Sequence, residues 1–139
     1  MLQTAHKNKT FATLLAALLG AVGAHRFYLG GLYDRWGWLH AAALPASGVV
    51  MAAAPGANPY FWYLPLTVSL LAAFLEALVL GLMPDDKWDA GHNAASGRRS
   101  ESSWPLAIVL VATVMVGAGV LIAAMARMSD LLYTGGAYG

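Results

Sequence analysis

The sequence contains no cysteine, which excludes disulfides, thiolate metal sites and a cysteine nucleophile. Charge is also scarce, because Asp, Glu, Lys and Arg make up 11% of the 139 residues, against a typical ~25%. A soluble domain of this size exposes much of its surface and needs more charge to cover it. With a hydrophobic fraction of 59%, the composition excludes an ordinary soluble globule and a disordered chain. It indicates a single-domain integral membrane protein.

Groups that carry out chemistry are missing as well. The net charge is +1 and no basic patch is present, so nucleic acid is excluded as a partner. The Gly20-x-x-Gly23 pair lacks the lysine of a phosphate loop, and no nucleophile elbow is found. No two of the four histidines have the i, i+4 spacing of a helical metal site. The acidic residues of 85–92, with His92, fit a solvated loop better than a weak cation site. We therefore predict no enzyme, no cofactor and no metal.

The few charges leave long apolar stretches between them. None lies in 11–24 or 104–126, and only Glu76 lies in 36–83. A charge near the bilayer centre costs at least ~2.5–3.5 kcal/mol, so such windows are typical of membrane helices. We expect an all-α integral membrane protein. Its predicted segments are a basic N-terminal tail (1–10), a short helix (11–24), a linker (25–31), a helical hairpin (36–54 and 60–83), a polar loop (84–103), a last transmembrane helix (104–127) and a tail (128–139).

Segment length separates the helices into two kinds. A spanning helix needs ~20 residues, which predicts three full transmembrane helices in 36–54, 60–83 and 104–127. The 14 residues of 11–24 reach only about 21 Å. They dip into the bilayer and return, or they cross it by recruiting residues of the linker. Trp88 and Trp104, which flank the polar loop, are expected at the membrane interface.

The Lys and Arg positions favour one topology. If 11–24 dips and returns, seven cations (Lys7, Lys9, Arg26, Arg35, Lys87, Arg98 and Arg99) face the cytoplasm and only Arg127 lies outside. If all four stretches cross, the count is five against three with the N-terminus outside, and three against five with it inside. We expect a multi-pass protein of a bacterial cytoplasmic (inner) membrane. The linker 25–35 and the loop 84–103 are then cytoplasmic, and the C-terminal tail is periplasmic or external.

A cleaved signal peptide is the alternative for the N-terminus. Lys7 and Lys9 provide a basic region, 11–21 an apolar region, and Val22-Gly23-Ala24 a plausible cleavage site. Cleavage there would separate the apolar helix from the residues that follow it. Those residues carry the strongest motif of the chain, so we favour an uncleaved N-terminus.

That motif is His25-Arg26-Phe27-Tyr28-Leu29-Gly30, which follows a glycine-containing apolar helix and a basic lead-in. It resembles the TM-two domain family, small membrane domains of paired transmembrane helices joined by a short linker. The resemblance implies a fold and a cytoplasmic linker, but no activity. Glu76, before Pro84-Asp85-Asp86-Lys87, is similar to an acidic residue in the family's last helix, where Asp is more usual. Two features depart from the family: Pro55–Pro59 breaks 36–83 in two, and 104–126 has no counterpart.

Arg26 and Glu76 form the sharpest candidate pair. An ionisable residue inside the membrane is a functional hypothesis by default, and its partner should be a cation at matching depth. Arg26 or Arg35 can reach Glu76 by extending inward. Such a pair either fixes the linker against the 60–83 helix or handles a proton or ion. A Glu76 that is simply protonated is a third option.

Small residues indicate where helices approach closely. Four recur at every fourth position of the first helix, and two more lie in the last: Ala12, Ala16, Gly20 and Ala24, then Gly119 and Ala123. They serve either intramolecular packing or association with another helix. We therefore predict a membrane scaffold or accessory subunit whose partners are the lipid bilayer and either a second copy or a larger membrane complex. A small transporter or ion- or proton-conducting subunit that uses Glu76 is the alternative.

Overall fold

The computed structural model describes residues 5–138, and every regular element among them is helical. The elements in chain order are α1 (Lys9–Leu19), the 3-10 turn η1 (Gly20–Val22), α2 (Ala24–Gly30), the 3-10 turn η2 (Gly31–Tyr33), α3 (Arg35–Ala53), α4 (Pro59–Trp62), α5 (Leu64–Leu82), α6 (Asp85–His92) and α7 (Trp104–Thr134). The predicted all-α class is confirmed for the described part of the chain.

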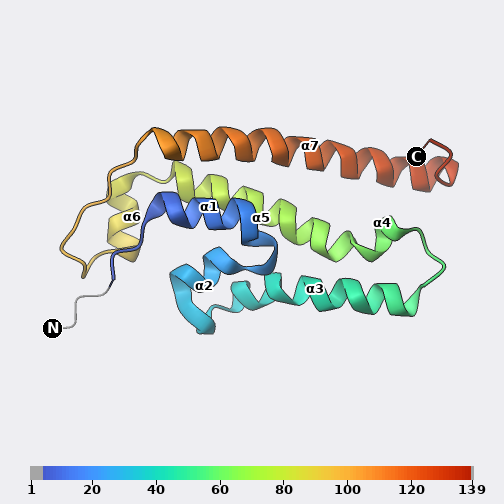
Figure 1. The fold of residues 1–139 in the computed structure, drawn as a ribbon, viewed down its shortest axis with the longest axis horizontal. Helices are drawn as coiled ribbons and strands as arrows, with labels where there is room; N and C mark the ends of the chain where they lie inside the picture. Colours follow the sequence, from blue (N-terminus) through green and yellow to red (C-terminus); the bar gives the residue numbers. More distant parts are fainter. Residues whose placement is uncertain (1–4, 139) are drawn as a thin grey trace.

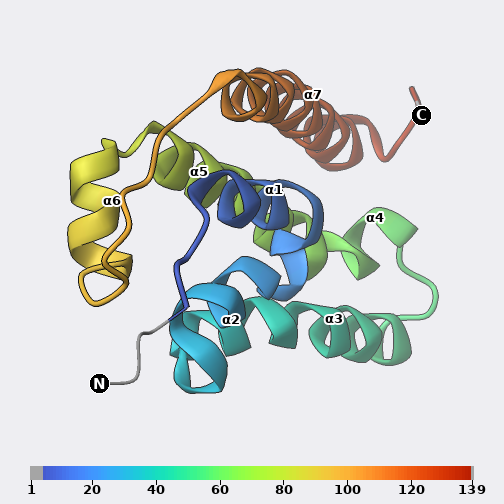
Figure 2. The same ribbon diagram turned by 60° about the vertical axis from the view of Figure 1, so that its left-hand side comes forward.

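The centre of the bundle is α5, which contacts α1, α3 and α7. The three long helices α3, α5 and α7 lie side by side and alternate in direction (Figure 1). Figure 2 shows α1 beside α5 and α2 beside α3. The start of α1, the end of α2 and α6 lie at one end of the bundle, while α4 and the C-terminal end of α7 lie at the other (Figure 1).

Among the described residues, two helices are long and apolar enough by themselves to cross a membrane: α5 and α7. Of the three full spans predicted, the structure therefore supports two, and α3 does not meet this criterion. The exception is α3, which has 19 residues but carries His40, Pro45 and Ser47. His40 and Ser47 are buried inside the bundle. These residues make α3 less apolar than α5 and α7, which a count of charges along the sequence does not detect.

The short first helix does turn back within the protein. α1 ends at Leu19, η1 follows, and Gly23 adopts a left-handed conformation with φ of 81°. The chain then runs back alongside α1 as α2 (Figure 1). Residues 25–31, predicted as a linker, are therefore mostly helical. The first helix is short because the left-handed Gly23 reverses the direction of the chain.

Two other predicted segments differ from the observed ones. The stretch 84–103, predicted as a loop, contains the two-turn helix α6. Asp85 and Asp86 lie in its first turn, where negative charge favours a helix. The last helix α7 continues to Thr134, seven residues beyond the predicted end at 127, and Gly135 ends it in a left-handed conformation.

Trp88 lies in the interior of the protein. Its side chain is fully buried, and its indole Nε1–H donates to the carbonyl of Lys7 at 3.1 Å. Its ring stacks on His92, with 4.2 Å between the ring centroids. The carbonyl of Lys7 accepts from the indole N–H, so the buried ring has a partner for its polar atom. Trp88 therefore anchors α6 to the segment before α1.

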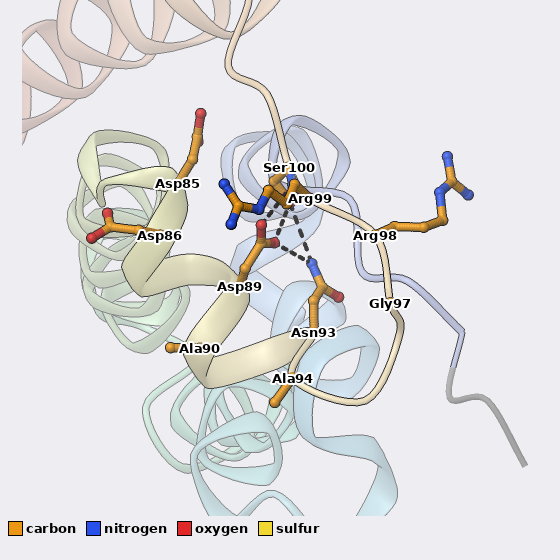
Figure 3. Close-up of a pocket in the computed structure, with 10 residues that line it drawn as sticks. All are labelled: Asp85, Asp86, Asp89, Ala90, Asn93, Ala94, Gly97, Arg98, Arg99 and Ser100. Carbon is orange, nitrogen blue, oxygen red and sulfur yellow. Dashed lines mark hydrogen bonds between the residues drawn. The ribbon is translucent and has the colours of Figure 1, made fainter. Parts of the chain in front are cut away.

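The loop after α6 is held by Asp89. Its carboxylate accepts from the side chain of Asn93 (2.9 Å) and from the backbone N–H and hydroxyl of Ser100 (both 2.6 Å). These bonds, with that of Asn93 the largest cause, lower the pKa of Asp89 from 3.8 to about 2. Figure 3 shows the side chains of Asp89, Asn93 and Ser100 joined by hydrogen bonds.

The lowered pKa predicts an acid-sensitive loop. Because the folded pKa lies below the unfolded one, the stabilisation is present above about pH 4 and is lost as pH falls through about 2. We expect amide protection factors in 94–103, corrected for intrinsic exchange, to fall between pH 4 and 2. Asp89→Asn should lower them already at neutral pH, whereas Asp86→Asn, on an exposed residue of the same helix, should leave them unchanged. Equal protection in both variants would contradict this role of Asp89.

The small residues of the first helix are used for packing within the chain. Ala12 and Ala16 are fully buried, and a Cβ on Gly20 would lie 2.5 Å from the Cβ of Ala73 in α5. Ala24, the fourth member, is half-buried at the start of α2. The stripe therefore allows α1 and η1 to approach α5 closely.

The small residues of the last helix are placed differently. Gly119 and Ala123 are both exposed. No described atom outside its own helix lies within 4 Å of a Cβ built on Gly119. A Cβ built on Gly117, by contrast, would lie 3.3 Å from the ring of Phe74 in α5. The α5–α7 contact thus leaves the Gly119–Ala123 face of α7 uncovered by the described residues.

Candidate functional site

Arg26 of α2 and Glu76 of α5 form a bidentate ion pair. The Nε–H of Arg26 donates to Oε2 of Glu76 at 3.0 Å, and Nη2–H donates to Oε1 at 2.8 Å. The side chains are 30% and 26% exposed. The parallel arrangement matches the planar fork of a guanidinium to a carboxylate and fixes both groups in orientation. Arg35, the other predicted partner, is exposed at the start of α3.

Two histidines that the sequence analysis did not connect with Glu76 complete the cluster. His25 of α2 is 1% exposed, and its Nε2 hydrogen-bonds to Oε2 of Glu76. His40 of α3 is 7% exposed, and its Nε2 lies 3.7 Å from the same oxygen. The two imidazole rings meet edge to face, with centroids 5.6 Å apart. One carboxylate thus connects residues from α2, α3 and α5.

A hydrogen-bond chain fixes the orientation of His40. The hydroxyl of Ser69 donates to the carbonyl of Ala21 at 2.7 Å, which uses its only proton. Nδ1 of His40 lies 2.7 Å from the same hydroxyl and must therefore be the donor there. In the neutral ring the other nitrogen, Nε2, then carries a lone pair. That lone pair faces the cluster around Glu76.

His25 is buried with one nitrogen unpaired. While its Nε2–H donates to the carboxylate, its Nδ1 has no hydrogen-bond partner among the described residues. A buried polar atom without a partner costs about 1–3 kcal/mol. The cluster therefore carries an energetic cost that a well-packed apolar group would avoid.

An open groove reaches the cluster between α3 and α5. It has a volume of about 430 Å³. Its wall is almost wholly apolar, with Leu39, Ala43 and Val68 among the lining residues, and its polar members are His40, Ser69 and Glu76. Of the cluster, His40 and Glu76 line this groove, whereas His25 and Arg26 do not.

Glycines position α2 so that Arg26 and His25 face α5. A Cβ on Gly23 would lie 2.5 Å from the carbonyl oxygen of Gly37, and one on Gly37 would lie 2.7 Å from the ring of Phe27. The close approach lets Phe27 pack over the start of α3, where it meets Trp38 edge to face at 5.3 Å. The Phe27 position of the motif is thus explained by packing.

The other motif residues connect α2 to the N-terminal segment and to α3. Tyr28 accepts from the backbone N–H of Asn8 at its hydroxyl (2.9 Å) and from Nζ of Lys7 at its carbonyl (2.7 Å). Gly30 leaves room for Asp34, whose Oδ2 would be 2.7 Å from a Cβ there, while Leu29 is half-buried. Asp34 in turn caps α3 by accepting from the N–H of Trp36 and Gly37.

The acidic residues near α6 do not gather as a cation site. Asp85 pairs with Lys9 and accepts from Ser102, and Asp89 holds the loop as described. The bond from Lys9 is the largest cause that lowers the pKa of Asp85. The adjoining pocket, about 470 Å³, therefore has two of its carboxylates already bound by the protein (Figure 3).

One group of side chains in the described residues has the composition of a metal site: His25, His40 and Glu76. One ligand atom from each lies within 4.8 Å of the others. Spacing could not identify it, because the three residues come from three different helices. One feature of the sequence could have indicated the site: each of the three residues lies in an apolar segment or in the HRFYLG motif, where polar residues are rare.

Comparison with known proteins supports the family resemblance and limits its extent. No curated protein and no solved structure matches the chain. The model of the TM2 domain family matches residues 5–52, which cover α1 to α3 but not α5 or α7. The match ends before α5, so Glu76 lies outside it. The match includes the HRFYLG motif, so over residues 5–52 this chain is similar to the TM2 domain.

Proposed function

We propose that this chain is a non-catalytic scaffold or accessory subunit of a bacterial inner membrane that acts through helix–helix packing. The observation that carries the proposal is the uncovered Gly119–Ala123 face of α7. Exposed apolar side chains do not by themselves indicate a partner, because lipid tails are equally apolar. Small residues at every fourth position do indicate a partner helix, because they let its backbone approach closely. The equivalent stripe of α1 is already occupied by α5.

We propose a second copy of this chain as the occupant of that face. The chain has no cysteine, so single cysteines give clean crosslinks. Gly119→Cys should form a disulfide-linked dimer in native membranes at low expression. Thr113→Cys, on the same helix but only 3% exposed, should not. Self-association through this face is wrong if the two variants crosslink equally or if neither does.

The proposed topology places the α6 end of the bundle in the cytoplasm. Lys7 and Lys9 lie at this end, where they bond to Tyr28, Met83 and Asp85. In this arrangement α1 and α2 dip in and return, and α3 crosses within the bundle because its polar groups face α5 and α2. A reporter fused at residue 10 should then read cytoplasmic, and one at the C-terminus external. An external reading at residue 10 would favour a crossing first helix.

The conducting alternative from the sequence analysis is less well supported by the geometry. A carboxylate that carries ions along a path must release its partners, whereas Glu76 is held by two bonds from Arg26 and one from His25. A fixed geometry is what a structural ion pair provides. Proton or ion flux into liposomes, compared between the unmodified chain and the Glu76→Gln variant, separates the two proposals.

A further inference from the structure

We propose that His25, His40 and Glu76 form a binding site for one divalent first-row transition metal of the Zn²⁺ or Co²⁺ class. Two imidazoles and a carboxylate are the donor set that such ions prefer. The three residues come from α2, α3 and α5, so a bound ion would crosslink the TM2 domain to the helix that follows it. This site is independent of the proposed scaffold function.

The orientation of His40 is the first argument. Metal-binding histidines almost always donate their second ring N–H to a protein acceptor, which fixes the tautomer and the ring. Nδ1 of His40 donates to Ser69, which is itself held by the carbonyl of Ala21. The lone pair of Nε2 is thereby held 3.7 Å from a carboxylate oxygen, where two acceptors face each other without a proton between them. A cation between them removes that conflict.

The distances are the second argument. Metal–ligand bonds of about 2.0–2.2 Å place two ligands roughly 3.3 Å apart in a tetrahedral site. The His40–Glu76 separation of 3.7 Å is close to this value, and all three ligand atoms lie within 4.8 Å. The His25 nitrogen is nearer than 3.3 Å to Glu76 and has to move outward. Small side-chain rotations therefore suffice, with no change in the helices.

The proton on His25 has a place to go. To ligate through Nε2, the ring must carry its proton on Nδ1 instead. Nδ1 is buried without a partner in the present tautomer, so moving the proton there sacrifices no existing bond at Nδ1. The hydrogen bond to Glu76 is exchanged for a bond to the metal.

The fourth coordination position faces the groove between α3 and α5. Because this groove is lined by His40, Ser69 and Glu76, water or a small anion can complete the coordination. Arg26 is the competing cation, since it holds the same carboxylate through two hydrogen bonds. We therefore expect Arg26→Gln to increase metal affinity, an effect opposite to its effect on stability.

The test uses the full chain purified in detergent, with Co²⁺ as the probe and Zn²⁺ as the competitor. We expect one Co²⁺ per chain, visible tetrahedral absorption bands, and displacement by Zn²⁺. His40→Asn keeps a donor for Ser69 but lacks Nε2, and should weaken Co²⁺ binding by at least ~100-fold. Ser69→Ala removes only the orienting bond and should weaken it by ~10–100-fold. His92→Asn, in α6 and outside the cluster, is the matched control and should bind as the unmodified chain does.

The outcomes separate the alternatives. The proposal is overturned if the unmodified chain shows no tetrahedral Co²⁺ bands, or if His40→Asn and His92→Asn bind equally. Size-exclusion elution and helical circular dichroism identify a variant that has lost its fold. If His40→Asn is such a variant, Ser69→Ala and Arg26→Gln decide the matter, because a merely structural cluster does not predict opposite changes in metal affinity for these two.

Discussion

Glu76→Gln should destabilise the protein by about 3 kcal/mol, the lower end of the range for removing one partner of a buried pair. The change removes the carboxylate that binds Arg26 through two hydrogen bonds, and leaves Asp34, whose Oδ2 lies 3.9 Å from Nη1 of Arg26, as a more distant counter-charge. The two side chains are about a quarter and under a third exposed, so the loss should lie below that of a fully buried pair. Abundance in native membranes and thermal unfolding in detergent measure it. Glu101→Gln, on an exposed loop residue, is the matched control and should have no effect.

The double variant decides what the pair does. If Arg26 and Glu76 act as a structural unit, Arg26→Gln with Glu76→Gln should recover part of the loss, with a coupling of about 0.5–3 kcal/mol. Arg35→Gln, at an exposed arginine, should not recover it. The scaffold proposal fails if Glu76→Gln assembles normally in liposomes yet abolishes a proton or ion flux that the unmodified chain supports.

Gly23→Ala is the second substitution with a large expected effect. Gly23 has φ of 81°, and a Cβ there would lie 2.5 Å from the carbonyl oxygen of Gly37. A left-handed conformation costs a residue with a side chain about 1–2 kcal/mol, and overpacking against a neighbouring backbone costs a further 1–3 or so. We expect a total loss of about 2–5 kcal/mol, because the turn that returns α2 along α1 cannot form without displacing α3.

Substitutions at two other glycines separate the cost of the left-handed conformation from the cost of the contact with Gly37. Gly31 has φ of 70° with nothing described within 4 Å of its Cβ position, so Gly31→Ala should cost only the conformational ~1–2 kcal/mol. Gly119 lies within α7 with an unremarkable φ and open space, so Gly119→Ala should stabilise the monomer by about 0.5–1 kcal/mol. Thermal unfolding in detergent ranks the three. A Gly23→Ala loss no larger than that of Gly31→Ala would mean that the contact with Gly37 is unimportant.

The sequence alone predicted that Arg26 pairs with Glu76. A charge in lipid costs free energy, and the apolar segments contain few charged residues that could be partners. The sequence did not predict that His25 and His40 also lie beside Glu76. His25 and Arg26 are adjacent in the chain, and their joint approach to Glu76 depends on the direction in which α2 runs after the turn at Gly23. His40 bonds to the hydroxyl of Ser69, which lies 29 residues away in the chain.

The helices also differ in how far the sequence alone identifies them. α5 and α7 are apolar around much of their surface, and residue composition alone identifies them. α3 hides polar residues against the bundle, so its placement depends on its neighbours. α6 is polar and short, and Trp88 holds it through a carbonyl 81 residues earlier in the chain. No local pattern contains that contact.

By itself, the sequence determined the helical membrane class, the apolar segments and the TM2 motif, since the cost of burying charge and the steric freedom of glycine act on each residue wherever it lies. Only the tertiary structure decided which small-residue stripe is already covered, which groups surround Glu76, and which face of α7 is open. Those outcomes depend on the angles and offsets at which helices pack, and these are set by contacts between residues far apart in the chain.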